Sequence, residues 1–74
     1  MSLQATVRRV LKAAPFALPD VAADAGLSYH TIRAYAYGKR TPEPENVAKL
    51  VRALRRRAEK ILDLADRLER EAGG

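Results

Sequence analysis

The chain has 74 residues, enough for one small domain, with fourteen Lys or Arg against nine Asp or Glu and a formal net charge of +5. It has no cysteine and a single histidine, His30, which excludes disulfides, thiolate metal sites and a structural zinc site. No apolar run approaches the roughly 18 residues that span a bilayer and no signal-peptide pattern opens the chain, so we expect a soluble, cytoplasmic protein.

The first predicted helix begins after Ser2, an acceptable N-cap residue. It ends near Ala14, because Pro15 disfavours helical geometry in the residue before it. Apolar residues at spacings of three and four lie on one face of this helix: Leu3, Val7, Val10, Leu11 and Ala14. The basic residues lie off that face: Arg8, Arg9 and Lys12.

Two short helices are predicted next, over 19–25 and about 28–37. Gly26 would end the first in a left-handed conformation, and Ser28 would cap the second, which ends before Gly38. Two helices joined by so short a turn form a helix-turn-helix unit. We expect its inner contacts to come from six residues: Val21, Ala22, Ala25, Leu27, Ile32 and Tyr35.

The last predicted helix is long, from about Glu45 to Ala72, and follows the loop that contains Pro42 and Pro44. Glu43 and Glu45 lie where the helix dipole favours negative charge. Strand patterns are absent, so the fold class is predicted to be all-α. Residues 1–54 would form a body of four or five helices, and 55–74 a C-terminal extension of the last helix.

Apolar residues of the long helix repeat at spacings of four and three, the pattern of a heptad seam: Val47, Val51, Leu54, Ala58, Ile61, Ala65, Leu68 and Ala72. The first part of the seam should pack on the body. From Ala58 onward we expect a homodimer, because little in a 74-residue chain is left to cover it. The predicted interface is Ala58, Ile61, Leu62, Ala65, Leu68 and Ala72.

One alternative for this helix stays open, in which it folds back over the first helix as a monomeric bundle. Charged residues four apart are expected to pair on its surface, Asp63 with Arg67 and Asp66 with Arg70. The run of basic residues over 55–57 is either a nucleic-acid clamp or a solvated stretch. We favour the solvated stretch, because the run encircles the helix.

Charge is unevenly distributed along the chain. Residues 1–57 carry eleven basic and four acidic side chains, whereas 58–74 carry three and five. A basic body suits a polyanionic partner. Tyr29, His30 and Arg33 project outward near the start of the helix at 28–37, the end that reaches base edges in helix-turn-helix proteins, and Tyr37 is a further candidate for a phosphate contact.

The stretch 20–33 resembles the helix-turn-helix of bacterial repressors. Its continuation, through the loop Gly38-Lys39-Arg40-Thr41-Pro42 to Leu54, resembles the Cro and phage-repressor family, also called the xenobiotic-response-element type. The resemblance covers about residues 17–54, and that loop is its most specific part. It implies a lambda-repressor-like fold and a set of DNA contacts: Tyr29, His30 and Arg33 to bases, and Thr31, Lys39 and Arg40 to phosphates.

These features predict a sequence-specific, DNA-binding transcriptional regulator. It would be a homodimeric repressor that places the helix at 28–37 in the major groove and is associated with the nucleoid. Its partners would be double-stranded DNA and a second copy of the chain, with no membrane and no small-molecule ligand. No nucleophile with an acid or base beside it and no Gly-rich phosphate loop is present, so neither an enzyme nor a cofactor or metal is expected. Two alternatives stay open: a protein-interaction module that uses the long helix, and a DNA-architectural or recombination accessory protein.

Overall fold

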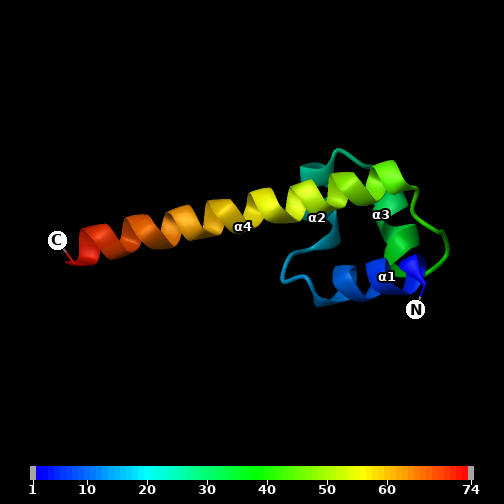
Figure 1. The fold of residues 1–74 in the computed structure, drawn as a ribbon, viewed down its shortest axis with the longest axis horizontal. Helices are drawn as coiled ribbons and strands as arrows, with labels where there is room; N and C mark the ends of the chain where they lie inside the picture. The colour runs from blue at the N-terminus through cyan, green and yellow to red at the C-terminus, as the bar shows by residue number, and fades with distance from the viewer. Residues whose placement is uncertain (1, 74) are drawn as a thin grey trace.

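The computed structural model describes residues 2–73, which form four α-helices and, over that range, no strand. Three short helices, α1 (Leu3–Ala13), α2 (Leu18–Ala25) and α3 (Tyr29–Ala36), gather at one end of the molecule (Figure 1). The fourth, α4 (Pro44–Gly73), starts in this body and leaves it as a straight rod, which gives overall dimensions of 50 × 24 × 19 Å. The all-α class is confirmed, and each helix lies within about one residue of its predicted bounds.

The helix starts and stops follow from local chemistry. The Ser2 hydroxyl accepts a hydrogen bond from the Ala5 amide at 3.1 Å, as an N-cap residue does. Gly26 ends α2 with φ +70°, a conformation that strains any residue with a side chain. Only Leu27 and Ser28 separate this glycine from α3, so α2 and α3 are joined by a tight turn. In the described residues, no helix has both the length and the apolar character needed to cross a membrane.

The core is built around the inner face of α3. Ile32 and Tyr35 of α3 and Val21 of α2 are its largest fully buried side chains. Helix α3 packs against both α1 and α2, and α2 packs in turn on the first half of α4. The buried side chains of this core cluster are Val7, Leu11, Val21, Ala22, Ala25, Ile32, Tyr35, Ala36, Leu50 and Ala53.

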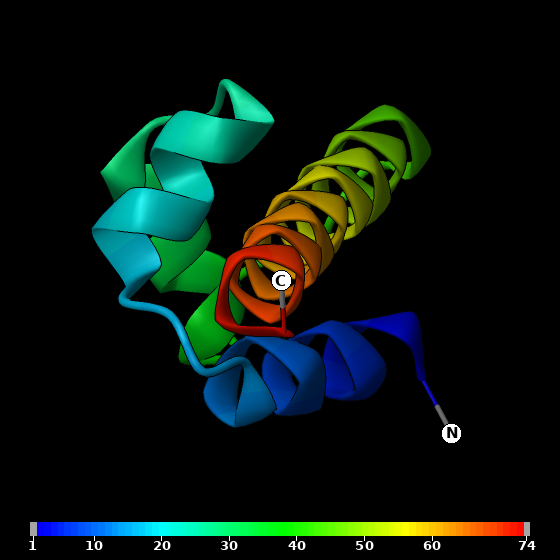
Figure 2. The same cartoon turned by 90° about the vertical axis from the view of Figure 1, so that its left-hand side faces the viewer.

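The predicted apolar face of α1 is only partly buried. Val7 and Leu11 contact the core, but Leu3 is 46% exposed and Val10 is 42% exposed. Leu3 and Val10 therefore share the apolar face of α1 but lie outside the core. Figures 1 and 2 give the reason: α4 extends away from the body, so the alternative in which it folds back over α1 is not formed.

The face of α4 that packs on the body also differs from the predicted seam. Val51 was expected in the core but is 40% exposed, whereas Leu50 and Ala53 are buried. Val47 is only partly buried. The contact face is thus shifted around the helix toward α2, the helix that α4 contacts most.

A charged contact holds α4 at the point where it leaves the body. The Nε of Arg57 donates a hydrogen bond to Oδ2 of Asp24 on α2, and its guanidinium lies 4.7 Å from the ring centroid of Phe16. Arg57 is therefore partly buried and bound to α2, so the favoured prediction of a solvated stretch is wrong for this residue. The hydrogen bond from Arg57 lowers the pKa of Asp24 below its usual range, against a smaller opposing effect of burial.

Two valines provide a matched test of this core. We expect Val21→Ala to reduce the free energy of unfolding by about 2 kcal/mol, because it removes two methyl groups from a closely packed site. Val10→Ala should change it by less than about 0.5 kcal/mol, since Val10 is exposed. Urea unfolding followed by circular dichroism measures both, and equal effects would contradict the described packing.

The Asp24–Arg57 contact predicts a dependence on pH. Because the folded pKa of Asp24 is lowered, the contact stabilises the fold above about pH 4, and the stabilisation is lost as the pH falls through the folded pKa. We expect Asp24→Asn to lower Tm at neutral pH, and the difference from the unmodified chain to shrink toward about pH 3. Asp66→Asn on the exposed end of α4 is the control. If Asp24→Asn lowers Tm by the same amount at neutral pH and at about pH 3, the proposed role of Asp24 is refuted.

Candidate nucleic-acid interface

Helix α3 is fixed on one side and free on the other. Ile32, Tyr35 and Ala36 are buried in the core. At 100° per residue, this places His30, Arg33 and Tyr37 on the opposite face, and all three are exposed. The helix therefore presents a polar face held rigidly by its own apolar face.

The free face of α3 forms a shallow hollow of about 590 Å³, lined by His30, Arg33, Ala34, Tyr37 and Lys39. The Arg33 guanidinium lies 5.5 Å from the ring centroid of Tyr37, so the ring holds the cation over the hollow. The structure thus brings four of the predicted contact residues together. Tyr29 lies in the first turn of α3, exposed at the margin of this face.

Thr31 lies apart from that hollow. The Ser28 hydroxyl accepts a hydrogen bond from the Thr31 amide at 3.1 Å and lies 2.8 Å from the Thr31 hydroxyl. Ser28 is therefore the N-cap of α3, as predicted, and the half-buried Thr31 side chain takes part in the same cap. A phosphate contact from Thr31 would have to share a hydroxyl already used in the helix.

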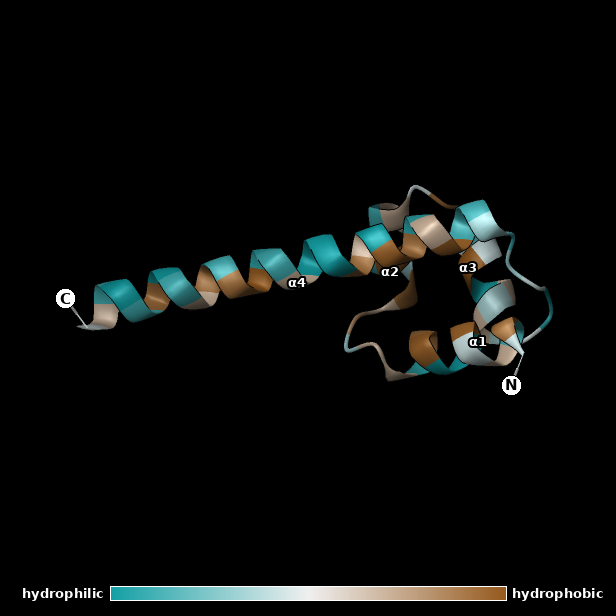
Figure 3. Ribbon diagram, viewed as in Figure 1, coloured by the Kyte–Doolittle hydropathy of each residue, from teal (hydrophilic) through white to brown (hydrophobic). Residues whose placement is uncertain are grey.

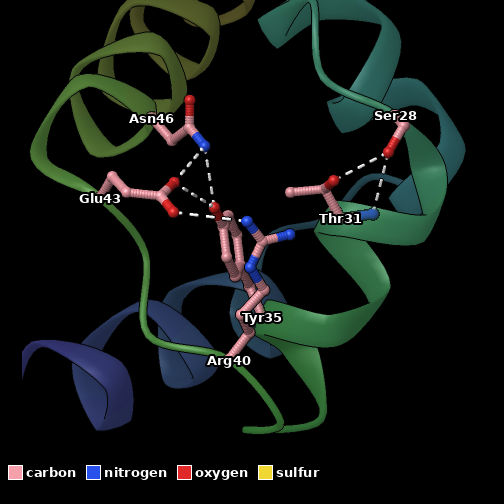
Figure 4. A network of polar contacts seen from close by, with 6 residues as sticks. All are labelled: Ser28, Thr31, Tyr35, Arg40, Glu43 and Asn46. Atoms are coloured by element: carbon pink, nitrogen blue, oxygen red, sulfur yellow. Dashed lines mark hydrogen bonds and ion pairs between the residues drawn. The ribbon is translucent and has the colours of Figure 1, made fainter.

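Arg40 belongs to a polar network between α3 and α4 (Figure 4). Its guanidinium lies 3.3 Å from Oε1 of Glu43 and 6.0 Å from the ring centroid of Tyr35. The buried Tyr35 hydroxyl donates to Glu43 at 3.4 Å and accepts from Asn46 Nδ2 at 2.9 Å. Asn46 also donates to Glu43 at 2.9 Å. The network ties the loop after α3 to the first turn of α4 and partly neutralises Arg40.

This network was not predicted from the sequence. There, Glu43 was expected only to complement the helix dipole, and Tyr35 to lie in the core without a partner for its hydroxyl. The spacing of three residues between Arg40 and Glu43, and again between Glu43 and Asn46, was the available signal. A buried tyrosine hydroxyl also requires a partner, which favours a polar residue nearby.

Helix α1 adds a second group of residues beside the end of α3. Gln4 Nε2 donates to the Gly38 carbonyl at 2.7 Å. Gly38 has φ +69°, and a Cβ on it would lie 3.5 Å from Cδ of Arg8. Arg8 is therefore next to the loop that carries Lys39, whereas its position in the sequence showed only that it lies off the apolar face of α1. The positions of Gln4 and Arg8 beside Gly38 depend on the packing of α1 against α3, so the sequence alone did not reveal them.

A third group of cations lies where α4 passes the turn between α2 and α3. Lys49, Arg52 and Arg56 line a hollow of about 360 Å³ together with Gly26 and its neighbours in α2. Basic side chains thus surround the α2–α3 pair from both α1 and α4. The body therefore presents positive charge from three separate elements.

The predicted dimer residues are all exposed on the part of α4 beyond Arg57, which we call the arm (58–73): Ala58, Ile61, Leu62, Ala65, Leu68 and Ala72. The predicted arm pairs Asp63–Arg67 and Asp66–Arg70 are not formed. The ion pairs within residues 2–73 are Arg40–Glu43 and Arg57–Asp24. Long side chains on a fully exposed helix gain little from pairing, because water screens the charges.

In the described part of the chain, no group of three or more potential metal ligands is clustered. His30 points to the hollow on α3 with Arg33 and Lys39 as its charged neighbours. Cations around an imidazole favour an anionic partner rather than a metal ion.

Two tyrosines test the network. Tyr35→Phe should reduce the free energy of unfolding by about 1 kcal/mol, because the hydroxyl loses its hydrogen bonds with Asn46 and Glu43, while the bond between Asn46 and Glu43 remains. Tyr37→Phe, at an exposed position, should change it by less than about 0.5 kcal/mol. Both are measured by urea unfolding, and a neutral Tyr35→Phe would show that the buried hydroxyl contributes nothing.

The candidate interface is therefore the free face of α3 with the loop that carries Lys39, and further basic side chains lie on α1 and α4. Comparison with known proteins finds no matching family model, no matching curated protein and no matching solved structure.

Proposed function

We propose that the protein is a sequence-specific DNA-binding regulator of the Cro and phage-repressor type, which acts as a homodimeric repressor. In this proposal α2 and α3 form a lambda-repressor-like helix-turn-helix unit, and α3 enters the major groove. One observation carries the proposal: the apolar face of α3 is locked in the core while the opposite face is free and carries His30 and Arg33.

The chemistry of that free face suits base edges. The major groove of B-DNA, about 12 Å wide, admits one α-helix. Arg33 can donate two hydrogen bonds to O6 and N7 of a guanine, the commonest specific contact in such complexes. Tyr29 and His30, nearer the start of α3, would contact neighbouring bases. Since α3 is anchored by buried side chains, these contacts would need little rearrangement on binding.

Phosphate contacts would fix the position of the body on the duplex. Lys39 and Tyr37 border the hollow on α3, and Arg8 extends the same edge from α1. Arg40 would contribute less than Lys39, because Glu43 already binds its guanidinium. Thr31 would contribute least, since its hydroxyl lies in the N-cap of α3.

The exposed arm of α4 favours a second candidate function, in which the protein is an interaction module that binds a different protein. Ile61, Leu62, Leu64 and Leu68 are large apolar residues and all are exposed. The basic side chains that surround α2 and α3 favour DNA as the primary partner, because a protein-binding arm alone would not require them.

The test is binding to duplexes selected from a randomised library, measured by fluorescence anisotropy over a series of salt concentrations. We expect the selected duplex to bind at least about a thousandfold more tightly than a scrambled one, with an affinity that falls steeply with salt. Arg33→Ala should reduce that discrimination by roughly 5- to 150-fold. Lys39→Ala should weaken binding to both duplexes by a similar factor and flatten the salt dependence.

Arg67→Ala is the matched control, because Arg67 lies on the arm, far from α3. It should leave both affinities unchanged. Selection that enriches no sequence, together with weak binding that Arg33→Ala does not alter, would rule out base reading by α3.

A further inference from the structure

The apolar face of α4 does not stop where the body ends. Ala53 and Arg57, which contact the body, line one groove of about 470 Å³ with Ile61 and Leu64 of the arm. Leu68 continues the same stripe one turn further and is 71% exposed. Apolar residues recur along the whole rod (Figure 3). The first half of this face is covered by α2, and the second half is bare.

Charge divides α4 into two segments of opposite sign. Residues 49–60 carry six basic and one acidic side chain, a net charge of +5, and we call them the root. Residues 61–73 carry four acidic and two basic side chains, a net charge of −2, and we call them the tip. A second α4 laid alongside in the same direction would place like charges together. Laid in the opposite direction along the arm, it would instead place the end of each tip, which carries Glu71, beside the end of the other root, which carries Lys60.

The position of the body excludes a parallel, in-register pair along this stripe. At the root, the face in question is already occupied by α2, as the contact between Arg57 and Asp24 shows. A parallel partner would need that same space. An antiparallel partner would lie along the bare half only and would end where the body begins. Antiparallel helix dipoles also attract each other, which favours the same arrangement.

We propose that a second copy of this chain pairs with the arm in antiparallel orientation, with the two-fold axis near Ala65. Ile61 would then face Leu68 of the second copy, and the two Ala65 side chains would let the helices approach closely at the axis. Glu71 of each tip would lie near Lys60 of the other root, at the end of the groove that also contains Asp24. The inference rests on the dimeric form of the proposed function and not on base reading.

This arrangement places the two bodies at opposite ends of a rod. Residue 50, in the centre of the body contact, is 15 residues from the axis at Ala65, so the two body contacts would lie about 45 Å apart along the helices. Two copies of α3 would then be held at a defined separation by a stiff spacer. A two-fold-related operator would have to match that separation.

Engineered cysteines test the orientation, because the chain has none of its own. Ala58 and Ala72 are exposed residues of the arm, so replacing either with cysteine should not disturb the core. They are equally far in sequence from Ala65, so an antiparallel pair places Ala58→Cys of one copy opposite Ala72→Cys of the other. An equimolar mixture of the two variants, mildly oxidised, should form the mixed 58–72 disulfide at least about tenfold in excess of 58–58 and 72–72 links, because only the mixed pair comes within bonding distance. Mass spectrometry of digested dimers identifies the link, and the same mixture in urea provides the random reference.

Predominant 58–58 and 72–72 links would overturn the antiparallel arrangement, and links no more frequent than in urea would overturn pairing altogether. Light scattering over a range of concentrations checks the unmodified chain, for which we expect a dimer that Leu68→Asp converts to a monomer. Arg70→Asp, which adds negative charge off the stripe, should leave it dimeric. A monomer at every concentration would refute the inference. Duplex binding measured on Leu68→Asp separates this failure from failure of base reading by α3.

Discussion

The burial of one face of α3 is the constraint on which the rest of the structure depends. Ile32 and Tyr35 are completely enclosed by neighbouring helices, and no other helix supplies two such large side chains to the core. The Tyr35 hydroxyl reaches Asn46 and Glu43, so the same residue also fixes the loop and the start of α4. Because α3 cannot rotate without exposing these groups, its opposite face keeps a defined orientation. The proposed contact of α3 with base edges requires that rigidity.

A second consequence follows from how α4 meets the body. Leu50 and Ala53 bury its first turns against α2, and the Asp24–Arg57 contact holds the helix where it emerges. The rod then continues in a straight line, so its apolar face extends into solvent. The buried apolar residues of the root and the exposed apolar residues of the arm therefore belong to one continuous stripe. The proposed pairing with a second copy would cover what the body leaves bare.

Most of the helical architecture was predictable because its signals are local. Ser2, Ser28, Gly26 and Gly38 mark helix ends through capping bonds and positive φ angles that involve only near neighbours in sequence. The burial of Val51 was predicted wrongly, and Leu3 and Val10 are exposed on the apolar face of α1, since apolar spacing shows which residues share a face but not whether a neighbour covers it. Arg57 was misjudged for the same reason: its partners, Asp24 and Phe16, are more than thirty residues away in sequence.

By itself, then, the sequence determined the four helices, their ends, the all-α class and the division into a basic body and an acidic end, because spacing, capping and charge are properties of neighbouring residues. It also placed His30, Arg33 and Lys39 among the candidate contacts. Only the tertiary structure decided that Gln4 and Arg8 lie beside Gly38, that Glu43 takes up Arg40, and that the free arm continues the buried face of α4. These features depend on the directions in which helices leave one another, and those directions are set by packing between residues that are distant in the chain.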